Sequence, residues 1–310
     1  MRRWLLAIAA LLTPAAATAR VDYTTMIPTL LAHDTRLLSI GWRLARANGP
    51  ICADSAPAAG LMLADLGQLD RPAEARAVLG IGGNVAIVAV APGGPAQRAG
   101  IAAGEQLVAV DGMAAADPDS AYVRIGAAFA SGGATTLAVA APHAASRSVR
   151  VTGENACRGH FQLLVGNKSA QTDGRHIMVS VELLAERPQD EEAAFMIAHE
   201  LAHVALQHRR RLDAGTRNYI TVRRTEREAD RLAPWLMANA GYDPSAAVRF
   251  MAWWGPKYSG GITRSPDHDG WRDRQELIEA EVAKIRAARA AQPQGLLDWR
   301  GQFSLEPVRQ

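Results

Sequence analysis

Cysteines, long apolar runs and clusters of like charge, which are typical of several large classes of protein, are few in this sequence. Only two cysteines, Cys52 and Cys157, occur in 310 residues, so no disulfide framework is available. No apolar run after the N-terminal region approaches the roughly 20 residues that a membrane-spanning helix needs. The net charge is only +3, and basic residues are spread along the chain apart from arginines at 209–211 and 223–224. We expect neither a membrane span nor nucleic-acid binding, while association with a membrane surface stays open.

The N-terminal residues have the composition of an export signal. Arg2 and Arg3 precede an apolar stretch over residues 4–12, and the small residues Ala17-Thr18-Ala19 follow it. This order predicts a signal peptide over residues 1–19. An uncleaved anchor is the alternative, although the apolar stretch is short for a span. We expect an exported protein, periplasmic if the source is bacterial.

The pattern of the remaining chain changes at about residues 78, 154 and 291. Apolar residues at helical spacing predict a helical segment over residues 20–77. Short β-type runs separated by glycine predict a small β-rich domain over residues 78–153. A mixed pattern over residues 154–290 includes a strand at 175–181 and a helix from about 190 to 210, and residues 291–310 form a predicted tail. The fold class is therefore α+β.

The two cysteines flank the predicted β-rich domain. In an oxidising compartment they could form one bridge, Cys52–Cys157. Such a bridge would hold the β-rich domain as an insert between two fixed points. Two unpaired buried thiols are the alternative.

Within the β-rich domain, a turn, a short helix, a glycine turn and a strand follow one another in PGGPAQRAGI (92–101) and GEQLVAVDG (104–112). This order resembles the PDZ domains of bacterial exported proteases. The resemblance implies binding of an extended peptide as an added strand, with a terminal carboxylate received by a glycine-containing loop. The candidate loop is Leu79-Gly80-Ile81-Gly82. A purely structural or regulatory insert is the alternative.

Catalytic chemistry is indicated by His199-Glu200-Leu201-Ala202-His203 on the predicted helix. Residues four apart share one helix face, so both imidazoles can reach a single ion, with Glu200 beside them as a base for activated water. A catalytic zinc site needs a third protein ligand. Downstream, Glu226 and Asp230 are again four apart. One can reach the metal while the other accepts the free N–H of a ligand histidine.

The HELAH motif, followed by EREAD (226–230) and NAGYDP (239–244), resembles the zinc peptidase family M forty-eight, whose relatives include HtpX and the CAAX prenyl proteases. The resemblance covers roughly residues 167–274 and implies a mainly helical zincin-type domain with a small sheet and one zinc ion per chain. Carried over by motif, the ligands are His199, His203 and Glu226, the general base is Glu200, and Asp230 supports a ligand histidine. Glu228 is the rival third ligand.

The same family carries a histidine followed six residues later by an arginine, a spacing that His268 and Arg274 reproduce. By resemblance His268 would approach the metal or the oxyanion, and Arg274 would position carboxylates or the tetrahedral intermediate. The sequence departs from the family in having Asp269 where proline is usual. Pro234 is expected to bend the second helix beyond the site. The other histidines near these motifs are expected to be ordinary surface or core residues, namely His160, His176 and His208.

The predicted function is that of a zinc-dependent endopeptidase acting on extended or misfolded polypeptides in the cell envelope. The strand at 175–181 is expected to pair with the substrate edge to edge. A non-proteolytic, chaperone-like peptide-binding protein with a latent zinc site is the alternative. A zinc hydrolase for a small non-peptide substrate is a third hypothesis.

Overall fold

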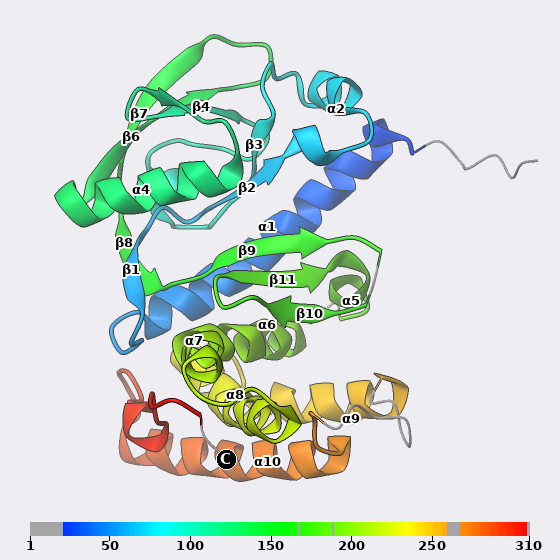
Figure 1. Cartoon of the computed structure of the whole chain (residues 1–310), viewed down its shortest axis with the longest axis vertical. Coiled ribbons are helices and arrows are strands. Elements are labelled where there is room, and N and C mark those ends of the chain that lie inside the picture. Colours follow the sequence, from blue (N-terminus) through cyan, green and yellow to red (C-terminus); the bar gives the residue numbers. More distant parts are fainter. Residues whose placement is uncertain (1–20, 167, 188, 259–266, 309–310) are drawn as a thin grey trace, which may run out of the picture.

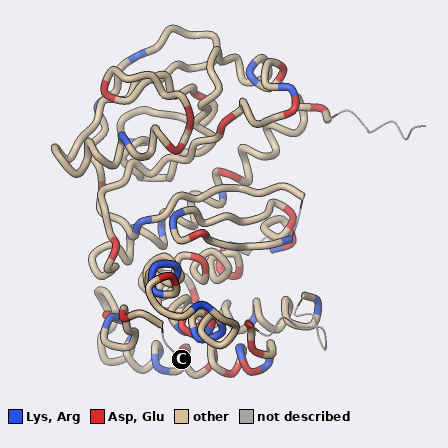
Figure 2. Tube along the Cα trace, viewed as in Figure 1, with Lys and Arg blue, Asp and Glu red and all other residues tan. Residues whose placement is uncertain are grey.

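The computed structural model describes residues 21–308 except 167, 188 and 259–266 (Figure 1). The predicted signal peptide, residues 1–19, lies outside the described residues. In the part of the chain that is described, no helix is both long and apolar enough to cross a membrane. Lys and Arg residues lie interspersed with Asp and Glu along the trace, and both signs occur close together in the lower helices (Figure 2).

A long helix, α1 (Tyr23–Asn48), begins the described chain and runs between its upper and lower parts (Figure 1). Its N-cap is Asp22, whose side chain accepts a hydrogen bond from the Thr24 N–H. The predicted apolar stripe is its buried face. The rest of the segment 20–77 is not wholly helical, contrary to prediction. It contains β1 (Ser55–Ala58), β2 (Leu61–Asp65), η1 (Leu66–Gln68) and α2 (Pro72–Leu79).

The β-rich domain is built on an antiparallel sheet with strand order β2-β3-β4-β6-β7 and β5 paired to β4. Strand β2, which the sequence pattern assigned to the helical segment, is an edge of this sheet because three successive apolar residues, 61–63, are buried there. Helix α4 packs on the sheet over a core that includes Phe129 and Leu137. The remaining elements are β3 (Val85–Val90), α3 (Pro95–Arg98), β4 (Gln106–Val110), β5 (Met113–Ala114), α4 (Pro118–Gly132), β6 (Ala134–Ala140) and β7 (Ser146–Thr152).

The chain enters and leaves the β-rich domain side by side. β1 pairs antiparallel with β8 (Glu154–Cys157), with Ser55 opposite Cys157. Next to this ladder the predicted disulfide between Cys52 and Cys157 is present, with a Cα–Cα distance of 5.5 Å. The domain is therefore an insert fixed at both ends, as the cysteine positions indicated.

The lower part of the molecule places a three-stranded sheet over a layer of helices (Figure 1). The strand order is β10-β11-β9, with β11 central. The prediction that residues 175–181 offer a free edge is therefore wrong, because β11 has a neighbour on each side, and β10 is an edge strand instead. The elements are β9 (His160–Leu164), β10 (Ala170–Thr172), β11 (His176–Ser180), α5 (Val181–Ala185), α6 (Asp190–Ala205), α7 (His208–Asp213), α8 (Tyr219–Asn239), α9 (Ala246–Tyr258) and α10 (Trp271–Ala291).

One helix differs in detail from its prediction. The helix expected to reach residue 210 stops at Ala205, and Gln207 adopts a left-handed conformation (φ 53°) before α7 begins. Helix α8 starts with a capping box at Asn218 and continues through Pro234 to Asn239. The predicted C-terminal tail is packed against the molecule: Leu297, Trp299 and Val308 are buried, and a short η3 (Arg300–Gln302) lies between them. The predicted α+β fold class is confirmed.

Candidate metal centre

Helix α6 carries both motif histidines. Acidic residues occupy its first turn, where their negative charge interacts favourably with the positive end of the helix dipole. Nearly all of its later residues are buried. The imidazoles of His199 and His203 lie one turn apart and face α8, which packs against α6 and presents Glu226. The two predicted histidines and the predicted glutamate therefore meet in one place.

The three side chains converge on a common point. The Nε2 atoms of His199 and His203 are 3.3 Å apart, and the Glu226 oxygens lie 3.3 Å from His199 Nε2 and 3.4 Å from His203 Nε2. Ligand atoms held tetrahedrally at zinc bond lengths are about 3.3–3.5 Å apart. Within the described residues, these three side chains are a group that could hold a metal ion. Two imidazoles and one carboxylate also leave a fourth coordination position free, which fits a catalytic ion.

The electrostatics of this centre favour a positive charge. Burial lowers the pKa of His199, but the neighbouring carboxylates of Asp230 and Glu226 outweigh burial and raise this pKa to about 10. Burial raises the pKa of Glu226, yet the surrounding imidazoles hold it well below its ordinary value. The buried carboxylate is thus stable only with a cation beside it, and a divalent ion meets that requirement.

Asp230 contacts the imidazole of His199 at the nitrogen that faces away from the centre. Its Oδ1 lies 3.0 Å from His199 Nδ1, so the Nε2 atom is left to face the centre. Arg274 donates two hydrogen bonds to the same carboxylate, of 2.7 and 2.8 Å. Burial raises the pKa of Asp230, but the Arg274 guanidinium overcomes this and brings the pKa to about 2. Asp230 is therefore an anion held rigidly between a cation and an imidazole.

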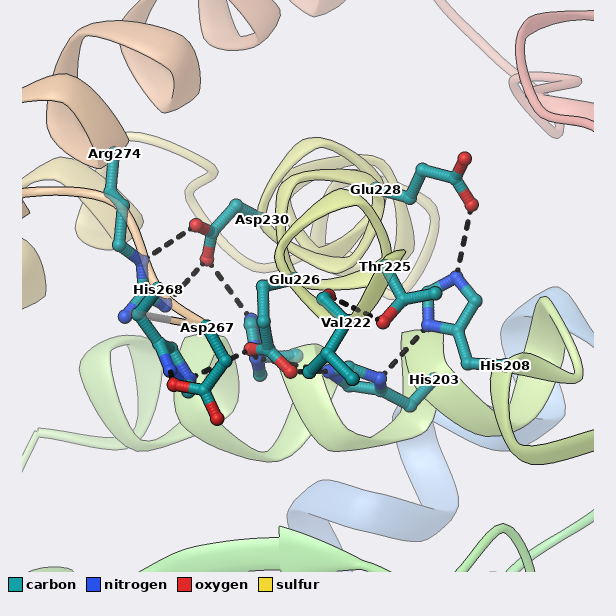
Figure 3. A network of polar contacts seen from close by, with 11 residues as sticks. His203, His208, Val222, Thr225, Glu226, Glu228, Asp230, Asp267, His268 and Arg274 are labelled. Carbon is teal, nitrogen blue, oxygen red and sulfur yellow. Dashed lines mark hydrogen bonds and ion pairs between the residues drawn. The ribbon is translucent and has the colours of Figure 1, made fainter. Parts of the chain in front are cut away.

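His268 lies at the mouth of the centre. Its Nε2 is 3.2 Å from Glu226 Oε2, its Nδ1 is 2.8 Å from Asp267 Oδ1, and its side chain is 38% exposed. The structure thus brings His268 close to the predicted ligands. Arg274 also lines the cavity beside these residues, and its guanidinium contacts Asp230. Glu228, the rival ligand, points away from the centre (Figure 3).

Glu200 stands beside this centre without an ion-pair partner in the described part of the chain. Its carboxyl group lines a cavity of about 440 Å³ together with the three convergent residues. Burial raises its pKa, which suits a carboxylate that must accept a proton. Edge strand β10 borders the same cavity, and the rings of Phe250 and Trp254 form part of its wall.

The sequence pattern missed one polar group in the site. His208 is only 2% exposed, and its Nδ1 lies 2.9 Å from His203 Nδ1. On its other side, Nε2 lies 3.2 Å from Glu228 Oε2, and Glu228 accepts a 2.7 Å hydrogen bond from Arg211. Helical spacing would place His208 off the motif face, so periodicity gave no signal for it. The sequence showed a second carboxylate, Glu228, two residues after Glu226, but its burial and its contact with His208 became known only from the structure.

His160 and His176, also expected to be ordinary residues, lie where the β-rich domain meets the lower sheet. His160 stacks on Tyr122 of α4 with ring centroids 4.0 Å apart. His176 lies 3.3 Å from Asp119 of α4 and 2.9 Å from Asp173. Neither reaches the metal centre.

The predicted carboxylate-binding loop has its amides already engaged. Gly80 and Ile81 donate to the last carbonyls of α2, and Gly82 donates to Gln106 Oε1 at 3.1 Å. In this conformation Leu79-Gly80-Ile81-Gly82 ends a helix rather than offering free N–H groups. A groove of about 340 Å³ lies instead between α4 and residues 56–61. There the Tyr122 hydroxyl accepts a 2.8 Å hydrogen bond from the Leu63 N–H of β2.

Comparison with known families agrees with this division of the chain. Residues 87–139 match the family model described as "PDZ domain", and residues 137–254 match the one described as "Putative metallopeptidase domain". The second match spans both motif histidines, Glu200, Glu226 and Asp230 but stops before His268. No curated protein and no solved structure gives a significant match. The chain therefore combines a PDZ domain with a metallopeptidase-like domain, which implies a bound metal and peptide substrates.

Proposed function

We propose that the protein is a zinc-dependent endopeptidase that cleaves extended or misfolded polypeptides, a soluble relative of the M forty-eight peptidases. The observation that carries the proposal is the convergence of His199, His203 and Glu226 beside Glu200 in one cavity. A purely structural zinc site would complete its shell with a fourth protein ligand and would not need an adjacent base.

Zinc bound by these three residues would supply a Lewis acid that acidifies water and polarises a peptide carbonyl. Glu200 lines the same cavity and accepts the proton of the attacking water, which its raised pKa favours. The guanidinium of Arg274 donates two hydrogen bonds to Asp230, so its proposed role is to position that carboxylate. His268 is partly exposed on the cavity and is the side chain placed to donate to a developing oxyanion.

The substrate is proposed to be an extended chain. Edge strand β10 borders the cavity, so a polypeptide can add to it by backbone hydrogen bonds with little demand on its sequence. This role replaces the one expected of residues 175–181. The groove between α4 and residues 56–61 is a second place where an extended segment, such as a substrate terminus, can bind.

We also propose that the protein is exported and serves quality control in the cell envelope. The basic and apolar order of residues 2–19 and the Cys52–Cys157 bridge support an oxidising destination.

The test is the exchange Glu200→Gln, which keeps the size of the side chain but removes the base. Cleavage of an unfolded protein such as casein should fall at least about 100-fold, while the variant retains one zinc ion per chain by elemental analysis. Glu191→Gln on the exposed side of the same helix is the matched control and should cleave normally. A zinc-loaded wild type that binds casein without cutting it would instead favour the chaperone-like function.

A further inference from the structure

We propose that His208 is a positioning residue for the metal ligand His203, acting through an imidazole–imidazole hydrogen bond that Glu228 orients. This inference rests on the proposed function, specifically on a metal ion held by Nε2 of His203. It assigns a role to a buried polar group for which neither the motif spacing nor the family matches provide one.

The break between α6 and α7 creates this contact. On an uninterrupted helix a residue five positions after His203 would point to a different face. Instead α6 ends at Ala205, Gln207 takes the left-handed conformation, and His208 begins α7. A non-glycine residue in this conformation costs roughly 1 kcal/mol. Contacts that the turn creates must therefore offset this cost. What the turn brings together is the pair of Nδ1 atoms 2.9 Å apart, with ring planes at 82°.

The positions of the hydrogen atoms in the series His203–His208–Glu228 follow from the geometry of the contacts. Nε2 of His203 faces the centre and must be unprotonated to bind a metal, so its Nδ1 carries the hydrogen. That hydrogen is donated to His208 Nδ1, which leaves the His208 hydrogen on Nε2. This second hydrogen points at Glu228 Oε2, 3.2 Å away. A carboxylate can only accept, so Glu228 fixes the tautomer of His208 and thereby that of His203.

Glu228, at the end of this series of hydrogen bonds, is fixed by an arginine in the same way as Asp230. Arg211 is 3% exposed and donates to Glu228 at 2.7 Å, as Arg274 does to Asp230. Arg211 is fixed in turn by the C-terminal segment, since its Nε donates to the Glu306 carbonyl at 2.9 Å. Each ligand histidine thus contacts a buried side chain whose supporting carboxylate is bound by an arginine. The His199 support is an anion and the His203 support is a neutral imidazole.

The experiment measures zinc affinity by competition with a fluorescent chelator, which does not depend on catalysis. His208→Phe removes the acceptor and should weaken zinc binding about 10–100-fold. His208→Asn keeps an acceptor at the position of Nδ1 and should recover most of that affinity. Leu206→Ala removes a buried apolar side chain at the same junction but no hydrogen-bonding group, so it should lower stability while zinc affinity is retained.

Nitrogen-15 NMR of the zinc-loaded wild type gives a second readout, and the hydrogen of His208 should reside on Nε2. Equal zinc affinity of His208→Phe and the wild type, or a hydrogen on His208 Nδ1, would overturn the inference while leaving the peptidase proposal intact. A wild type that binds no zinc would overturn both. Equal losses in His208→Phe, His208→Asn and Leu206→Ala would show that the junction is merely structural.

Discussion

Buried carboxyl groups in this protein differ according to whether a cation stands beside them. Burial alone raises a carboxyl pKa, as it does for Glu200 and for Asp34 on α1. Where an arginine is in contact the sign reverses, and the pKa values of Asp230 and Glu228 fall to about 2. Arg274 therefore keeps Asp230 ionised, and His208 together with Arg211 keeps Glu228 ionised, whereas burial raises the pKa of Glu200.

Asp34 allows this reasoning to be tested away from the site. It is 7% exposed, and burial raises its pKa from 3.8 to about 7. Below pH 3.8 the group is protonated in both folded and unfolded chains and costs nothing. Between that pH and about 7 only the unfolded chain loses the proton, so stability falls as pH rises and stays lowered above 7.

Asp34→Asn should therefore match the wild type in stability at pH 4 and exceed it at pH 8 by roughly 2–4 kcal/mol. Urea unfolding at both pH values measures the difference. Asp22→Asn, at the exposed cap of the same helix, is the control for changing a carboxyl group on α1 and should show no such gain at pH 8. A gain that is identical at pH 4 and pH 8 would contradict the argument.

At the scale of elements, the C-terminal segment is a structural part of the helical layer. Trp299 is 2% exposed, and its indole N–H donates to Asn48 Oδ1 of α1 at 3.3 Å. Asn239 at the end of α8 exchanges hydrogen bonds with the backbone of Leu297. The segment thus links two helices that carry or flank the site.

Trp299→Ala should destabilise the fold by about 3–5 kcal/mol, because it removes a large buried side chain and leaves a cavity. Leu305→Ala, at a 46% exposed position of the same segment, should change stability by less than about 0.5 kcal/mol. Thermal and urea unfolding provide the measurement. Similar small effects of both substitutions would mean that the segment is dispensable.

At the scale of the whole molecule, the disulfide and the β1–β8 ladder join the two parts. The bridge spans 105 residues, which include the sheet of the β-rich domain. Closing so long a loop restricts the unfolded chain strongly. The double exchange Cys52→Ser with Cys157→Ser should therefore cost about 2–5 kcal/mol of stability. Zinc content should survive in the folded fraction, because the bridge does not touch the metal centre.

Unfolding of the wild type with and without reductant checks the same point by another route. Reduction should lower the stability of the wild type but not that of the double serine variant. An unchanged stability on reduction would show that the β1–β8 ladder is sufficient to hold the insert.

The amino-acid sequence alone indicated which side chains are candidates for the metal centre and in which order the parts of the chain follow one another. His199, His203 and Glu200 followed from helical spacing, and Glu226 and Asp230 from motif resemblance. These assignments were within reach because a helix converts a spacing of four into one face, whatever lies around it. The pairing of the two cysteines was likewise indicated by their position on either side of the insert.

Which groups outside the motifs reach the site could be seen only once the chain was folded. Gln207 in a left-handed conformation turns His208 back onto His203, and the strand order makes β10, rather than β11, an edge beside the cavity. β2 likewise joined the sheet from a segment predicted to be helical. These features depend on contacts between residues far apart in the chain. Local periodicity carries no information about such contacts, because it records only which face of an element is buried.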